Sequence, residues 1–223
     1  EFSPNLLVRT QCHSNEQKLE ATAAVELEGT DPYLSLGITG RGQDEGWMAV
    51  SIRPYNPEGI QFIEEIAFVP RQPGLLVDNE IPVEMSERPE RVVFSTYDDG
   101  DVIHKVDRTE SERRVSCVVG MATAAALFPL LSNDDKEIEI RIPLERKMHR
   151  KVNTIVQPPQ TWTSCVAETA TLNIPDGKIQ FLFDAAVRSL VLLSADDVVP
   201  GPYTYKRFWF RDGCLMLHAL LCL

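Results

Sequence analysis

The chain has 223 residues, with 22 Lys and Arg against 33 Asp and Glu, which gives a formal net charge of −11 at pH 7. Nucleic acids and anionic membranes select for clustered Lys and Arg, so this balance argues against either as the main partner. No apolar run approaches the roughly 18 residues of a membrane span. The five cysteines are scattered and lack metal-ligand spacing, which favours a protein of the reducing cytoplasm. We expect neither a metal nor a cofactor.

Short alternating runs of β-branched and aromatic residues dominate the chain from Asn5 to Leu144. Such alternation predicts strands with one buried face, as in Glu137–Ile142, where three isoleucines share a side. Many strands in sequence imply two packed sheets. We therefore expect a large antiparallel two-sheet β-sandwich over residues 1–155. The predicted strands are Leu6–Cys12, Lys18–Glu28, Tyr33–Thr39, Trp47–Pro54, Ile60–Val69, Gly74–Val77, Ile81–Met85, Arg91–Tyr97, Val102–Val106, Arg113–Met121 and Lys136–Pro143.

Three segments of this β region allow more than one interpretation. The turn Asp98–Gly100 is typical of a hairpin, and a calcium site there is the minor alternative. The apolar run Val118–Phe128 has no period and predicts a buried central strand that ends in a loop, with a short helix as the alternative. In Ser51–Ile60 we interpret Arg53, Tyr55, Asn56 and Glu58 mainly as residues of a tight turn. Their alternative role is contact with a neighbouring domain.

The period changes in the second part of the chain. The one basic cluster, Arg146–Lys151, has no interleaved aromatic residue and is interpreted as a solvated loop. Prolines then break regular structure near 156–160 and at Pro175. Between Asp176 and Ser194 apolar residues recur every three or four positions, which predicts an amphipathic helix with Asp176 as its N-cap. Residues 156–195 are therefore predicted to form a helical linker.

An aromatic loop and an apolar helix fill residues 196–223. Sugars offer an apolar face that stacks on aromatic rings and hydroxyls that Arg donates to and Asp accepts from. The segment therefore predicts part of a sugar-binding site. Alternatively, Asp212 is only a helix N-cap and the aromatic residues only fill a core. The candidate site residues are Tyr205, Trp209, Phe210, Arg211 and Asp212.

The motif Pro200–Asp212, followed by an apolar helix, resembles the first helix of the (α/α)6-toroid catalytic domain in bacterial amylo-α-1,6-glucosidases and glycogen-debranching-like proteins, which are glucoamylase-type glycoside hydrolases. Ser51–Ile63 resembles their sandwich less strongly. The resemblance implies a sandwich, a linker and the first helix of a truncated toroid. It also implies that Arg211 and Asp212 contact glucose beside Trp209 or Phe210, while the catalytic acid and base lie on later helices.

By this resemblance, the chain is the non-catalytic N-terminal part of a hydrolase acting on α-glucans. Its expected partners are an α-glucan or oligosaccharide and a missing C-terminal catalytic domain, and bare apolar helix surfaces predict a possible homodimer. Two alternatives stay open: an independent carbohydrate-binding module, and a structural or dimerising domain. Exposed aromatic residues on a sheet face favour the module, whereas a bare apolar sheet face favours a missing domain or partner.

Overall fold

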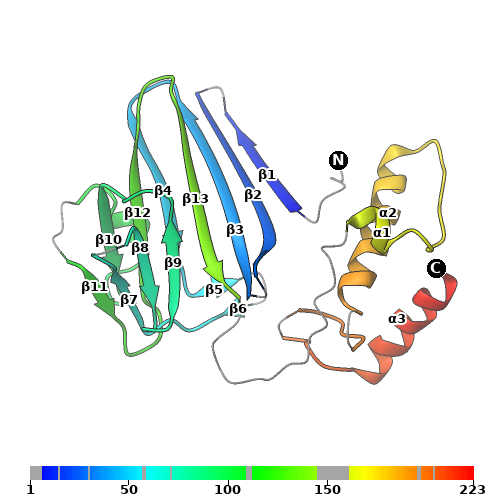
Figure 1. The fold of residues 1–223 in the computed structure, drawn as a ribbon. Helices are drawn as coiled ribbons and strands as arrows, with labels where there is room; N and C mark the ends of the chain where they lie inside the picture. The colour runs from blue at the N-terminus through cyan, green and yellow to red at the C-terminus, as the bar shows by residue number, and fades with distance from the viewer. Residues whose placement is uncertain are drawn as a thin grey trace. The chain divides into compact units, whose positions relative to one another are not determined.

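A computed structural model describes residues 7–14, 16–29, 31–56, 59–70, 72–108, 112–144, 161–194, 197–202 and 204–223. The chain divides into a β unit within Leu7–Ile155 and a helical unit within Val156–Leu223 (Figure 1). The fold is mainly β and its sheets are antiparallel, which confirms the expected class at this level. The basic cluster, the prolines at 158 and 159, Glu58, Tyr203 and Asp196 lie outside the described residues. The division into a β-sandwich (1–155), a linker (156–195) and the start of a toroid (196–223) stays a prediction.

Most of the predicted strands are confirmed within a few residues. The strands are β1 (Leu7–His13), β2 (Gln17–Glu28), β3 (Asp31–Gly42), β4 (Gly46–Ile52), β5 (Tyr55–Asn56), β6 (Gly59–Ile60), β7 (Glu65–Phe68), β8 (Gly74–Val77), β9 (Ile81–Met85), β10 (Arg91–Ser95), β11 (Arg114–Ser116), β12 (Thr123–Leu130) and β13 (Asp135–Pro143). An eight-stranded sheet has the order β1-β2-β3-β13-β9-β8-β7-β11, and a three-stranded sheet has the order β10-β12-β4. The strands β5 and β6 form a small hairpin.

The main core lies between these two sheets. The larger sheet contributes fully buried side chains such as Ile66, Leu75 and Ile140, and the smaller contributes Phe94 and Phe128. No side chain of β1 or β2 belongs to this core, because the three-stranded sheet covers only the part of the larger sheet from β3 to β11. The apolar faces of β1 and β2 are therefore left largely exposed, with Val8 at 66% and Val25 at 62%.

The apolar run Val118–Phe128 contains a buried strand, as predicted, but the turn precedes the strand and does not follow it. Its second half belongs to β12, the central strand of the smaller sheet, where Phe128 is fully buried. Its first half is a turn in which Val118 is fully exposed and Gly120 has a φ of 71°. The long strand expected over Arg113–Met121 is therefore wrong, and only β11 forms there.

The strand expected over Ile60–Val69 is also interrupted, and only its ends form β6 and β7. Between them, Ile63 makes a parallel bridge to Met121, and the carboxylate of Asp78 accepts hydrogen bonds from the backbone N–H groups of Glu64 and Glu65 at 2.8 and 2.9 Å. These long-range partners take the place of a continuous ladder. Alternation alone therefore overestimated the length of the strand.

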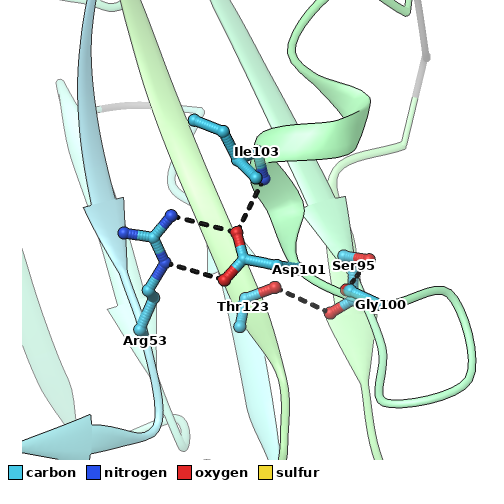
Figure 2. Close-up of polar contacts among 6 residues, drawn as sticks. All are labelled: Arg53, Ser95, Gly100, Asp101, Ile103 and Thr123. Carbon is cyan, nitrogen blue, oxygen red and sulfur yellow. Dashed lines mark hydrogen bonds and ion pairs between the residues drawn. The ribbon is translucent and has the colours of Figure 1, made fainter.

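The strand expected over Val102–Val106 is wrong, because Val102–Lys105 forms a 3-10 helix, η1. Asp101 caps this helix by accepting from the N–H of Ile103 at 2.9 Å. The same carboxylate receives two hydrogen bonds from Arg53, at 2.9 and 3.1 Å (Figure 2). The turn at Asp98–Gly100 does form, with a φ of 81° at Gly100, but it leads into η1 and not into a hairpin strand.

Arg53 therefore ties the end of β4 to the turn before η1. Its guanidinium lowers the pKa of Asp101 below the usual 3.8, with the Ile103 N–H as a further cause. The pairing accounts for Arg53 as a structural residue within the described part of the β unit. The alternative role of Arg53, contact with a neighbouring domain, gains no support from this pairing.

We expect Asp101→Asn to lower the free energy of unfolding by about 1–2 kcal/mol at neutral pH, because the charge-assisted pair with Arg53 is lost while asparagine can still cap η1. Both side chains are about one-third exposed, and solvent screening therefore keeps the expected loss small. Because folding depresses the pKa of Asp101, its contribution is present above about pH 4 and is lost as the pH falls through the folded pKa. Urea unfolding of both proteins between pH 7 and pH 2.5 measures the difference.

The matched control for this experiment is Asp98→Asn, since Asp98 is an exposed carboxylate in the same turn. It should leave stability within about 0.5 kcal/mol of the parent. A difference between the parent and Asp101→Asn that does not shrink in acid would contradict the ion-pair explanation.

The helical unit contains α1 (Trp162–Cys165), α2 (Gly177–Leu192) and α3 (Phe210–Cys222). The predicted N-cap is confirmed, because Asp176 accepts from the N–H groups of Lys178 and Ile179 at 2.9 and 3.1 Å. The apolar stripe of α2 is only half packed: Val187 is buried, whereas Leu182 is 55% exposed. Among the described helices, none combines the length and apolar character that crossing a membrane requires.

Candidate functional site

The five candidate site residues lie together in the helical unit, in the loop before α3 and in its first turn. The chain enters α3 through Trp209, whose extended backbone (φ −112°, ψ 119°) takes the N-cap position without a side-chain cap. Asp212 is the third helical residue, so the alternative that Asp212 is the N-cap is wrong. A carboxylate in the first turn still interacts favourably with the helix dipole.

The aromatic rings of the loop differ in how much surface they offer. The rings of Tyr205 and Trp209 pack in an edge-to-face arrangement with centres 5.6 Å apart. The guanidinium of Arg207 lies 4.7 Å from the centre of the Trp209 ring. Trp209 is consequently only 37% exposed, whereas Phe210 is 78% exposed. Phe210 and Tyr205 thus present more surface to a ligand than Trp209 does.

Arg211 and Asp212 contact each other within this first turn. One terminal nitrogen of Arg211 lies 3.3 Å from Oδ1 of Asp212, and the Arg211 side chain is 85% exposed. The Asp212 side chain is 34% exposed. An exposed guanidinium beside a half-buried carboxylate offers hydrogen-bond donors and acceptors to the same ligand.

Three contacts that hold this loop were not predicted from the sequence. The ring of Phe208 lies so close to buried Gly213 that an added Cβ would come within 2.4 Å of it, and the N–H of Gly213 bonds to the carbonyl of Trp209 at 2.6 Å. The third contact is the Arg207 guanidinium over the Trp209 ring. A glycine inside a predicted helix is the one available signal, because glycine is unfavourable there unless something packs against it.

A separate cavity of about 180 Å³ lies in the helical unit, beside α2. Its walls include Phe183, Asp184, Val187 and Arg188, and the guanidinium of Arg188 lies 5.6 Å from the centre of the Trp162 ring. This volume is below the roughly 300 Å³ at which sites for drug-sized ligands begin. The cavity was not anticipated from the sequence.

The β unit has a hollow of about 190 Å³ whose lining includes Tyr33, Glu28 and Arg141. The Arg141 guanidinium lies 4.0 Å from the centre of the Tyr33 ring and 2.9 Å from the Glu28 carboxylate. The Tyr33 hydroxyl donates to Glu26 at 2.6 Å, and this hydrogen bond raises the pKa of Tyr33. Because Arg141 covers one face of the ring, this tyrosine is a poor platform for stacking a sugar.

Cysteine and metal chemistry add little to the site. No disulfide links the five cysteines, all of which lie in the described part of the chain. Burial opposes ionisation of Cys117, but the backbone N–H groups of Tyr97, Met121 and Val119 together lower the pKa of its thiol. Within the described ranges, no three His, Cys, Asp or Glu side chains gather in a way that would hold a metal ion.

Comparison with known proteins does not identify the chain: no family model matches the sequence, and no curated protein is significantly similar to it. Any functional assignment therefore depends on the residues themselves and on the resemblance of the loop before α3.

Proposed function

We propose that the chain is the non-catalytic N-terminal part of a glycoside hydrolase that acts on α-glucans. In this proposal the β unit is the β-sandwich, α2 belongs to the linker, and α3 is the first helix of an (α/α)6 toroid. One observation carries the proposal. Within eight residues, Tyr205–Asp212, the chain presents exposed aromatic rings and an exposed arginine beside a carboxylate.

The chemistry of this segment suits a glucose unit. The Arg211 guanidinium donates to neighbouring hydroxyl groups, the Asp212 carboxylate accepts from them, and the Phe210 or Tyr205 ring stacks on the apolar face of the sugar. A neutral sugar also suits a chain with a net charge of −11, because it is not repelled by that charge.

Exposed leucines on α3 support the toroid part of the proposal. Leu215 is 67% exposed and Leu221 is 87% exposed, although both lie on a helix of largely apolar sequence. Helices that are apolar on most sides are normally covered by other helices. The later helices of a toroid would supply that cover.

The proposal assigns no catalytic residue to this chain. Inverting hydrolysis needs an acid and a base about 6.5–9.5 Å apart on either side of the scissile bond, and by the resemblance that pair belongs to later helices. The chain contributes glucose contacts, and its partner is the catalytic domain together with the glucan.

We expect the isolated chain to bind maltohexaose without hydrolysing it. Reducing-sugar release should equal that of a heat-killed sample, because the acid and base are absent. In amide NMR spectra the sugar should shift signals from Tyr205–Asp212, since the proposed contacts lie there.

Cellohexaose is the matched control, because it contains the same sugar in the opposite linkage, and it should shift these signals much less. Turnover of maltohexaose would contradict the non-catalytic assignment. Shifts confined to the β unit would instead support an independent carbohydrate-binding module.

A structural or dimerising role is the second candidate, and the bare sheet face favours it. The exposed apolar side chains of β1 and β2 are aliphatic, with Val8, Leu19 and Val25 between 46% and 66% exposed. An aliphatic sheet face suits contact with protein better than stacking on sugar. A carbohydrate-binding module would be expected to expose aromatic residues on a sheet face. The aliphatic face of β1 and β2 therefore favours a protein partner over such a module.

A further inference from the structure

The strand β1 forms one edge of the eight-stranded sheet in the described part of the chain. All of its seven residues pair with β2, from Leu7 opposite Ala24 to His13 opposite Lys18. On its other side no described strand follows. An edge strand of this kind presents a row of backbone donors and acceptors to which another strand can add.

Natural proteins usually protect such edges with proline, lysine, a bulge or a very short strand. The opposite edge of the same sheet follows this rule, because β11 has only three residues. In contrast, β1 is continuous over Leu7–His13, pairs without a bulge, and contains neither proline nor lysine. Its one arginine, Arg9, is turned toward its own sheet, where it lies 3.2 Å from Glu20.

The apolar face of the sheet reaches this edge. Val8, Thr10 and Cys12 lie on the same side of the sheet as their register partners on β2, which are Ala23, Ala21 and Leu19 in that order. Val8 is 66% exposed and Leu19 is 46% exposed. A strand added to β1 would extend this apolar face without a break.

We propose that a second copy of the chain adds to this edge, with β1 pairing antiparallel to β1 about a two-fold axis at Thr10. Leu7 then lies opposite His13 of the second copy, Val8 opposite Cys12, and Arg9 opposite Gln11. The whole strand is used, and the apolar faces of both copies lie on the same side. The interface is formed by the β unit alone, whereas the proposed glucan site belongs to the helical unit.

Charge favours this register. Two copies that each carry a net charge of −11 repel one another, but β1 contains no acidic residue. Arg9 faces a neutral amide across the axis, so no like charges lie directly opposite, an arrangement that would otherwise destabilise the pair. β1 is therefore a site where two acidic chains meet without direct repulsion.

Disulfide trapping tests the register. Cys12, Cys165, Cys214 and Cys222 are first replaced by serine, and buried Cys117 is kept. Thr10→Cys then places two cysteines directly opposite each other at the axis. Directly opposed residues of an antiparallel pair have Cα atoms about 4.5–5.5 Å apart, which lies within the Cα range of about 4.4–6.8 Å that a disulfide spans. Mild oxidation should give a reducible covalent dimer as the main product.

The matched control is His13→Cys, an exposed position on the same strand. In the proposed register two copies of residue 13 lie six positions apart, about 20 Å at the rise of a strand, so they should not cross-link. Equal cross-linking of both variants would indicate random collision and overturn the proposal, as would the absence of dimer from Thr10→Cys.

A non-covalent test uses sedimentation velocity. The parent chain should sediment as a dimer, and Thr10→Lys should give a folded monomer, because two lysines would then meet at the axis of an exposed strand. The control Val25→Lys alters the same face away from the paired segment and should stay dimeric. A monomeric parent, or dissociation by Val25→Lys but not by Thr10→Lys, would refute pairing through β1.

Discussion

Replacing Phe128 with alanine is expected to lower the free energy of unfolding of the β unit by about 3–5 kcal/mol, the range for aromatic truncation in a core. Phe128 is fully buried on β12, the central strand of the smaller sheet. Its ring belongs to the core shared by the two sheets, so its removal leaves a cavity and removes apolar contacts on both sides. Urea unfolding followed by β-sheet circular dichroism measures the loss.

Leu131→Ala provides the matched control. Leu131 lies just after β12 and is 57% exposed, so its truncation should change stability by no more than about 0.5 kcal/mol. A loss below about 1 kcal/mol for Phe128→Ala would contradict a single core between the two sheets.

In the complete enzyme that we propose, Arg211→Lys is expected to lower kcat/KM for an α-glucan about ten- to hundred-fold. Lysine keeps the charge but loses the planar fork that donates two hydrogen bonds at once. Loss of a charge-assisted hydrogen bond costs about 1.5–3 kcal/mol of transition-state binding, and each 1.36 kcal/mol is about one decade in rate. Steady-state kinetics on a maltooligosaccharide measure the change.

Asp212→Asn should cause a comparable loss of activity, because the amide replaces an acceptor carboxylate. Its effect on stability should be small, about 0.3–1 kcal/mol, because only the interaction of a first-turn charge with the helix dipole is removed. The control is Arg114→Lys, at a side chain that is 67% exposed in the β unit, and it should leave kcat/KM unchanged. If both site variants keep full activity while the protein stays folded, the Arg-Asp pair is architectural and the glucan proposal fails.

Much of the candidate site followed from the sequence, because its five residues lie within one short segment. Tyr205 and Trp209 precede α3, and Phe210, Arg211 and Asp212 form its first turn. What the sequence did not predict is how each one is held. Arg207 covers part of Trp209, and Phe208 packs against Gly213, so Phe210 is the most exposed ring of the site.

Local sequence determined those elements whose signal lies within the element itself. Alternation predicted β13, the exact limits of β8 and β9 follow from their flanking turns, and Asp176 begins α2 by capping it. Each of these depends on side chains a few positions apart, and such local preferences survive in almost any tertiary setting.

Tertiary structure decided the elements whose partners are distant in sequence. Val102–Val106 is rich in β-branched residues, as strands are. Its first four residues nevertheless form η1, since Asp101 caps this helix while paired with Arg53, which lies 48 residues away. The segment between β6 and β7 is broken because Ile63 bridges to Met121. The bare face of β1 and β2 depends on which strands the smaller sheet covers. Periodicity shows only that successive side chains of a strand point to opposite faces of the sheet. Which face is buried, and whether the strand forms at all, depends on the energy of packing against the rest of the fold.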